Sequence, residues 1–202
     1  MSSTLPLLHN AVYEKDTEKI KKLIIDENHD VDTLDDKEVT PLLFSIYLLS
    51  LEPMNTLIDH DANVNILSFD GWHILHLLAL NDNTDDALEM AKSLLEKSKT
   101  RININARLSD LSTPLHIAAS KGNKEMCELL LSHKALIDAQ DINDMTPLHV
   151  AVSNGNVEII ELLLSSGANT EMISKFGTPH RLADTLSGYD HIVEILEKHS
   201  AT

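Results

Sequence analysis

Residues 144–156 read DMTPLHVAVSNGN, and their pattern indicates how the whole chain is built. A polar turn leads into Thr-Pro-Leu-His, small apolar residues follow, and a glycine ends the run. The same frame recurs along the chain. The positions equivalent to Thr146 are 6, 40, 73, 113, 146 and 178, so the spacings are 34, 33, 40, 33 and 32 residues. A period near 33 residues over the whole chain is typical of a stacked repeat protein.

Each copy predicts a pair of helices. The hydroxyl of Thr146 can cap a first helix, and Pro147 suits the first helical position, where its missing N–H costs nothing. Gly155 ends this helix because glycine adopts the left-handed conformation cheaply. Residues 156–164 then predict a second helix with a wide apolar face, which ends at Gly167. Neither helix can bury its apolar surface alone, so the copies are expected to stack.

On these residues the chain resembles the ankyrin repeat family, whose first helix carries Thr-Pro-Leu-His-x-Ala. The motif is clearest in residues 113–119 and 146–152, and it is degenerate near Pro6 and His73. The resemblance implies a β-turn finger and two antiparallel helices in each repeat. The expected fold is therefore an all-α ankyrin-repeat solenoid, a single domain over residues 1–202. The expected repeats are repeat 1 (1–33), repeat 2 (34–66), repeat 3 (67–106), repeat 4 (107–139), repeat 5 (140–171) and repeat 6 (172–202).

Repeat 3 carries the extra residues of the 40-residue spacing. Residues 81–86 replace the usual tight turn, and residues 86–98 predict a longer second helix. The insertion can serve partner recognition, or it can be a neutral extension, because loops tolerate added length at small cost. At the other end, the last helix is expected to show a polar outer face that stops the stack from growing.

The charge excludes some partners. The chain has 202 residues with 16 Lys and Arg against 32 Asp and Glu, a formal net charge of −16. Nucleic acids are held mainly by basic side chains, so neither nucleic acid nor an anionic membrane surface is an expected partner. The charge favours a basic partner, or it only keeps the protein in solution. The longest apolar stretch, residues 42–51, is too short to span a membrane. We expect an intracellular location, in the cytoplasm, the nucleus or, for a pathogen protein, a host cell.

The residues give little support for catalysis. The glycines and prolines all take structural places in the repeats, and no phosphate-binding loop is present. His73 and His76 could share a helix face as metal ligands do, but no further ligand completes a set. Cys127 is expected to act as a small buried apolar residue. The sequence therefore predicts no enzyme activity, no metal and no cofactor. In the resembled family, the motif histidine is a structural hydrogen-bonding residue; here these are His9, His76, His116, His149 and His180.

The family resemblance implies a partner-binding surface formed by the fingers and the exposed side of the first helices. Its variable positions hold an uneven set of residues, with aromatic and aliphatic side chains gathered in the first three repeats. Such clusters are typical of contact surfaces. The candidate partner-binding residues are Tyr13, Leu34, Val39, Tyr47, Leu48, Leu67, Phe69, Asp70, Trp72, Leu80, Ile142 and Met145. A shifted finger could instead bury Phe69 or Trp72 locally. Phe44 is expected to be buried.

The sequence thus predicts a protein that binds another protein and is a monomer when free. Three narrower roles stay open. One is an inhibitor or sequestering protein similar to the inhibitors of NF-κB, and another is a pathogen effector acting on a host protein. The third is an assembly chaperone or adaptor. The identity of the partner separates these roles.

Overall fold

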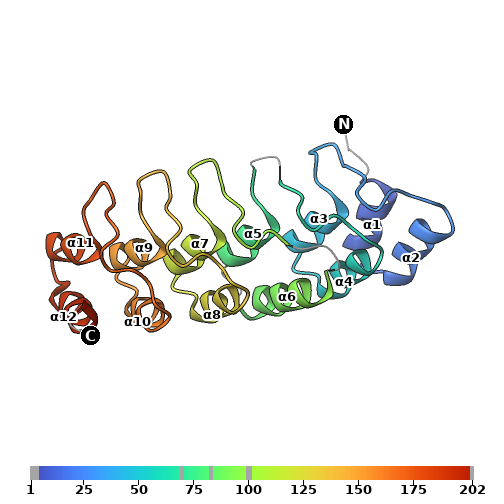
Figure 1. The fold of residues 1–202 in the computed structure, drawn as a ribbon. Coiled ribbons are helices and arrows are strands. Elements are labelled where there is room, and N and C mark those ends of the chain that lie inside the picture. The colour runs from blue at the N-terminus through green and yellow to red at the C-terminus, as the bar shows by residue number, and fades with distance from the viewer. Residues whose placement is uncertain (1–4, 69–70, 82–83, 99–101, 201–202) are drawn as a thin grey trace. The chain divides into compact units, whose positions relative to one another are not determined.

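The computed structural model describes residues 5–68, 71–81, 84–98 and 102–200. Over these residues the regular structure consists of twelve α-helices and two isolated β-bridges, Leu67–His73 and Ser174–Gly177. The chain divides into two compact units, residues 1–103 and residues 104–202. Each unit is an all-α repeat solenoid of three helix pairs (Figure 1).

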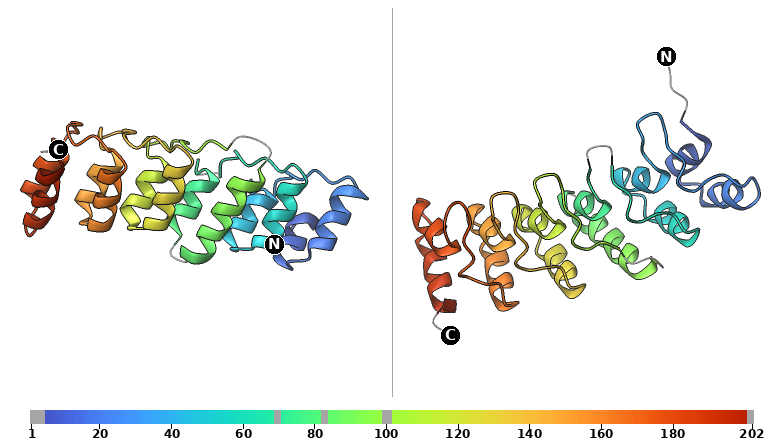
Figure 2. Two further views of the ribbon diagram at one scale, coloured as in Figure 1. Left: turned by 60° about the horizontal axis from the view of Figure 1, so that its bottom comes forward. Right: turned by 45° about the horizontal axis from the view of Figure 1, so that its top comes forward.

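The first unit holds repeats 1 to 3. Its helices are α1 (Leu7–Tyr13), α2 (Thr17–Ile25), α3 (Pro41–Tyr47), α4 (Leu51–Asp59), α5 (Ile74–Leu80) and α6 (Thr84–Lys97). The first helices of the repeats pack side by side in the order α1, α3, α5, and the second helices pack in the order α2, α4, α6. The loops that join one repeat to the next extend beside the row of first helices and form the fingers (Figure 2).

The second unit holds repeats 4 to 6 and repeats the plan. Its helices are α7 (Pro114–Lys121), α8 (Lys124–Ser132), α9 (Pro147–Ser153), α10 (Val157–Ser165), α11 (Pro179–Thr185) and α12 (Asp190–Ser200). Helices α7, α9 and α11 pack in one row, and α8, α10 and α12 pack in the other. Its fingers are joined through their main chains, because Ile142 N donates to Asp110 O over 2.8 Å and Lys175 N donates to Asn143 O over 3.0 Å.

The first helices begin as the sequence predicts. Thr146 precedes Pro147 and its hydroxyl accepts a hydrogen bond from His149 N, which satisfies an N–H that the first turn leaves without a partner. In repeat 3, His73 takes the place of the threonine, and its Nδ1 accepts a hydrogen bond from Leu75 N over 3.3 Å. A different side chain therefore supplies the same cap at the degenerate copy.

Repeat 3 confirms the longer second helix but not its expected start. Helix α6 has 14 residues, whereas α4 has nine. The helix begins at Thr84, so the expected turn over residues 81–86 is wrong at its far end. Asp85 and Asp86 lie in the first turn of the helix, where the helix dipole favours acidic side chains. Residues 82 and 83 lie outside the described residues.

The core of each unit lies between its two rows of helices. Small residues such as Ala118 and Ala151 are fully buried on the first helices, which lets neighbouring repeats approach closely. The final helix α12 buries Ile192 and Leu196, while Glu194 and other polar side chains face outward. This confirms the predicted polar outer face of the last repeat.

Candidate functional site: the finger and first-helix surface

The fingers are held in shape by side chains that close their turns. In the finger of repeat 2, the carboxylate of Asp35 accepts hydrogen bonds from Lys37 N over 2.8 Å and from Val39 N over 2.9 Å. In the finger of repeat 5, Asp141 binds Asn143 N and Met145 N in the same way. An aspartate at the start of a turn thus fixes the main chain around it. Most of the residues between these anchor points are exposed, among them Asp36, Lys37, Ile142 and Asp144.

The motif histidine of one repeat holds the base of the next finger. His9 Nε2 lies 2.8 Å from Val39 O in the first unit, and His116 Nε2 lies 3.0 Å from Met145 O in the second. Thr113 N donates to Nδ1 of His116 over 3.2 Å, so Nε2 carries the proton and donates to the carbonyl. His149 joins Gly177 O in the same arrangement. These hydrogen bonds fix the main chain at Val39 and Met145, where each finger meets its first helix.

Burial favours the neutral form of His116 and His149, the two histidines that hold fingers in the second unit. It lowers the pKa of His116 and of His149 below the usual histidine range. It also lowers the pKa of His73 to about 4, with a smaller contribution from the neighbouring His76. Neutral histidines can each donate one hydrogen bond and accept another, as this network requires. His180 differs, because its Nε2 lies 3.4 Å from Glu197 Oε1 and does not hold a finger.

The predicted binding residues of the first unit are placed unevenly. Five of them are exposed: Tyr13, Leu34, Tyr47, Leu67 and Leu80. Three are half-buried: Val39, Leu48 and Trp72. Phe69 and Asp70 lie outside the described residues. The first unit therefore displays a set of large apolar side chains on its fingers and first helices.

The sequence left open whether Trp72 is an exposed contact residue or is buried locally, and the structure shows it half-buried. Its main chain pairs with Ser68 across the finger, and its ring packs edge to face against His76, with 6.0 Å between the ring centres. The ring is thus supported by His76, and the residue is half-buried. A supported aromatic ring at a surface is suited to act as a contact anchor.

A hollow of about 420 Å³ opens in the first unit beside the finger of repeat 2. Its lining residues are Leu5, Pro6, Asp35, Asp36, Lys37, Val39, Phe44 and Tyr47. We call it the finger-2 hollow. Phe44 corrects an expectation, because it is half-buried and not buried. Its ring packs on His9, with 5.7 Å between the ring centres, and it also borders the hollow.

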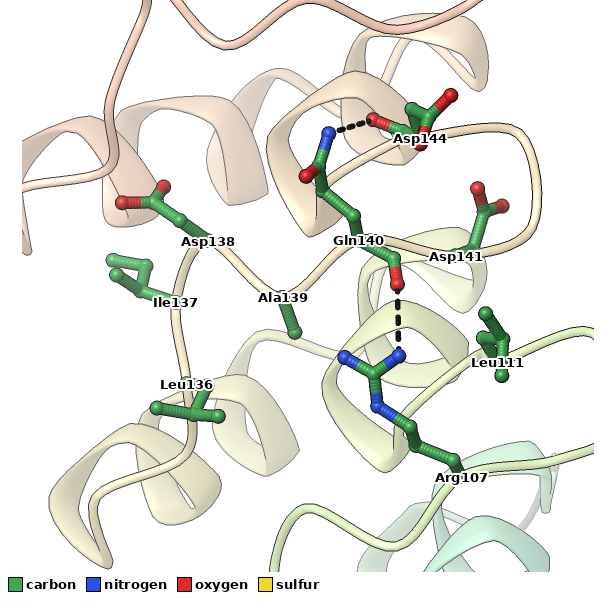
Figure 3. Close-up of a pocket in the computed structure, with 9 residues that line it drawn as sticks. All are labelled: Arg107, Leu111, Leu136, Ile137, Asp138, Ala139, Gln140, Asp141 and Asp144. Atoms are coloured by element: carbon green, nitrogen blue, oxygen red, sulfur yellow. Dashed lines mark hydrogen bonds between the residues drawn. The ribbon is translucent and has the colours of Figure 1, made fainter.

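In the second unit, the two predicted binding residues lie in the finger of repeat 5. Ile142 is exposed and Met145 is half-buried at the finger base. The side chains of Arg107 and Gln140 make hydrogen bonds to the main chain of the finger of repeat 5. Arg107 donates to Gln140 O over 3.4 Å, and Gln140 Nε2 donates to Asp144 O over 2.9 Å (Figure 3). These polar side chains thus join neighbouring parts of the unit.

Sequence reasoning missed other exposed apolar residues of the second unit. Leu111 is exposed in the finger of repeat 4, at φ +65°, and with Leu136 it borders a hollow of about 610 Å³ (Figure 3). The equivalent positions in repeats 2 and 5 hold the acidic residues Glu38 and Asp144, and repeat 3 holds Gly71. That contrast was the available signal. Ile173 and Phe176 are also exposed.

Cys127, the single cysteine of the chain, lies in the core. Cys127 is fully buried, and burial raises the pKa of its thiol to about 12, so it is protonated at neutral pH. No cluster of three or more His, Cys, Asp or Glu suited to a metal ion occurs in the described part of the chain. Among the described helices, none is long and apolar enough to cross a membrane.

Comparison with known proteins agrees with this architecture. Residues 8–107 and 86–173 match the family model described as ankyrin repeats in three copies. Human inversin is 31% identical over 106 residues, which is 52% of this chain and 10% of inversin. An ankyrin repeat protein of Rickettsia bellii is 29% identical over 162 residues, covering 65% of this chain and 22% of that protein.

A fowlpox virus ankyrin repeat protein is similar to a comparable extent. It is 30% identical over 140 residues, which is 64% of this chain and 27% of the viral protein. The chain thus spans less than a third of the length of each of these relatives. The similarity to these relatives therefore covers only a part of each of them.

Proposed function

The chain belongs to the ankyrin repeat family, and we propose that it is a non-enzymatic binding protein whose partner is another protein. Ankyrin repeats are generally protein–protein interaction modules. The proposed contact surface consists of the fingers and first helices of the first unit, centred on repeats 2 and 3. Ile142 and Met145 extend the proposal to a second contact area in repeat 5.

The observation that supports this site is the cluster of exposed apolar side chains in the first unit. Tyr47, Leu67 and Leu80 are exposed on the fingers or first helices although each is large and apolar. Exposing such groups to water is unfavourable, and clusters of them usually mark contact surfaces. Tyr47 also borders the finger-2 hollow, which offers a concave feature beside the cluster.

The histidines and the net charge support the other parts of the proposal. Histidine side chains often serve in catalysis or bind metals in other proteins. In this chain, His9, His116 and His149 instead form hydrogen bonds that hold the fingers, which supports a role without catalysis, metal or cofactor. The net charge of −16 supports a partner that is neither a nucleic acid nor an anionic membrane, and a monomeric free protein. We also propose an intracellular location, in the cytoplasm, the nucleus or a host cell.

The test is affinity capture from a cell lysate with the full chain as bait, read by mass spectrometry. The Tyr47→Ala/Trp72→Ala variant should lose the captured protein while its circular dichroism stays unchanged. The matched control is Phe176→Ala, because Phe176 is 53% exposed and Tyr47 is 49% exposed, and Phe176 lies in the second unit. The control should capture the partner as well as the unaltered chain does.

Equal capture by the unaltered chain and the double variant would contradict the proposed site. Capture of no protein by any form would contradict the proposed function. The captured protein also distinguishes the narrower roles of an inhibitor or sequestering protein, a pathogen effector and an assembly chaperone or adaptor.

A further inference from the structure

We propose that the finger-2 hollow receives one aromatic or branched aliphatic side chain from an extended, lysine- or arginine-rich segment of the partner protein. The inference rests on the proposed protein-binding function and adds the chemistry of the partner. Three features of the hollow support the inference: its lining is largely apolar, its wall is held in place by hydrogen bonds, and acidic residues surround it.

The lining provides an apolar socket. Leu5, Val39, Phe44 and Tyr47 contribute aliphatic and aromatic surface, and Leu5 and Tyr47 are exposed. The volume of about 420 Å³ falls toward the lower end of the range of about 300–1,000 Å³ that is typical of ligand sites. A space of this size suits one large side chain together with part of its main chain. Burial of that side chain would remove apolar surface of both proteins from water.

The wall of the hollow is held before any partner arrives. Asp35 fixes the finger turn through Lys37 N and Val39 N, and His9 Nε2 holds Val39 O over 2.8 Å. The ring of Phe44 rests on the ring of His9. A partner therefore meets a formed surface and needs to order little of this chain on binding.

Charge selects the kind of segment that carries the anchor. Asp35 and Asp36 line the hollow, and the neighbouring Glu38 is exposed. Among the described residues that line the hollow, Lys37 is the one basic residue. Over residues 1–103 the sequence has 19 Asp and Glu against nine Lys and Arg. Opposite charges across an interface speed association and reject wrong partners. A second copy of this chain carries the same acidic excess and fits this surface poorly.

The experiment selects peptides from a displayed library of random dodecapeptides against the full chain. Enriched peptides should share one Leu, Ile, Phe or Trp flanked by Lys or Arg. Fluorescence anisotropy should then show binding of such a peptide that weakens at least about tenfold in Tyr47→Ala and in Asp36→Lys. Phe176→Ala and Glu161→Lys are the matched controls, since Phe176 and Glu161 are exposed residues of the second unit. Both controls should bind the peptide unchanged.

Three results would overturn the inference: enrichment of acidic peptides, enrichment of peptides that bind Tyr47→Ala normally, or enrichment of none. Self-association measured by analytical ultracentrifugation that is lost in Tyr47→Ala would assign the hollow to a second copy and overturn it as well. Each of these results leaves the proposed function standing if lysate capture still depends on Tyr47 and Trp72, so the two proposals fail separately.

Discussion

At the scale of single residues, the first repeat shows what a missing N–H does. In repeats 4 and 5, Nδ1 of the motif histidine accepts a hydrogen bond from the threonine N–H. Repeat 1 has Pro6 at that position, and proline has no N–H. His9 Nδ1 is accordingly buried with no hydrogen-bond partner among the described residues. A buried polar atom in this state lowers stability.

Replacing Pro6 with threonine should therefore stabilise the protein. Pro6→Thr restores a donor N–H and a capping hydroxyl, and the extended backbone at position 6 (φ −54°, ψ 152°) accommodates threonine. We expect the free energy of unfolding in urea to rise by about 1 kcal/mol. Pro6→Ala restores only the N–H and should give a smaller rise. A loss of stability in both variants would contradict this account of His9.

His73 should make the protein sensitive to acid. Its pKa is about 4 in the folded chain, against 6.5 for an ordinary histidine. As the pH falls from 6.5 to 4, the unfolded chain gains a proton that the folded His73 does not take. The free energy of unfolding should fall over this window, by about 3 kcal/mol from this group at its lower end. His73→Thr should flatten that part of the pH profile measured by urea unfolding, and parallel profiles would refute the assignment.

At the scale of helices and fingers, the capping side chains determine where the first helices begin. Thr146 is fully buried and serves α9 through its hydroxyl, which also lies 2.9 Å from His149 Nδ1. Removing the hydroxyl leaves a helix N–H and a histidine nitrogen with fewer partners. The cap therefore couples the start of a helix to the histidine that holds the next finger.

Thr146→Ala should destabilise the protein by about 1–2 kcal/mol in chemical unfolding. Thr146→Ser keeps the hydroxyl and should cost much less. Ser153→Ala, an exposed position at the end of the same helix, should have little effect. Equal losses for the alanine and serine variants at position 146 would show that the cap hydrogen bond does not stabilise α9.

The sequence predicts the helices well and the surface less well, for physical reasons. Starts such as Pro147 follow from local caps, and the second helices follow from apolar spacing, so neighbours in sequence suffice. The half-burial of Phe44 and Trp72 depends on rings contributed by His9 and His76. The finger-2 hollow joins residues 5–6 to residues 35–47, and no local pattern predicts its depth. Leu111 lies at a position that holds Glu38 in repeat 2 and Asp144 in repeat 5, so the repeat frame does not predict an apolar residue there.

At the scale of the whole molecule, we propose that the six repeats form one domain, because the repeat frame continues across the boundary between the units. The chain has a single tryptophan, Trp72, which reports on the first unit, whereas far-ultraviolet circular dichroism reports on all helices. If the repeats unfold together, the two signals should share one midpoint in urea. A fluorescence midpoint at lower urea than the dichroism midpoint would show that the first unit unfolds separately.

Above all, we propose that the fingers and first helices of repeats 2 and 3 bind a partner protein. Hydrogen–deuterium exchange of the full chain, alone and with its captured partner, tests this claim most directly. We predict that the partner slows exchange in residues 34–48 and 67–80 and leaves helices α2, α4 and α6 largely unchanged. Protection confined to those second helices or to residues 104–202 would contradict it.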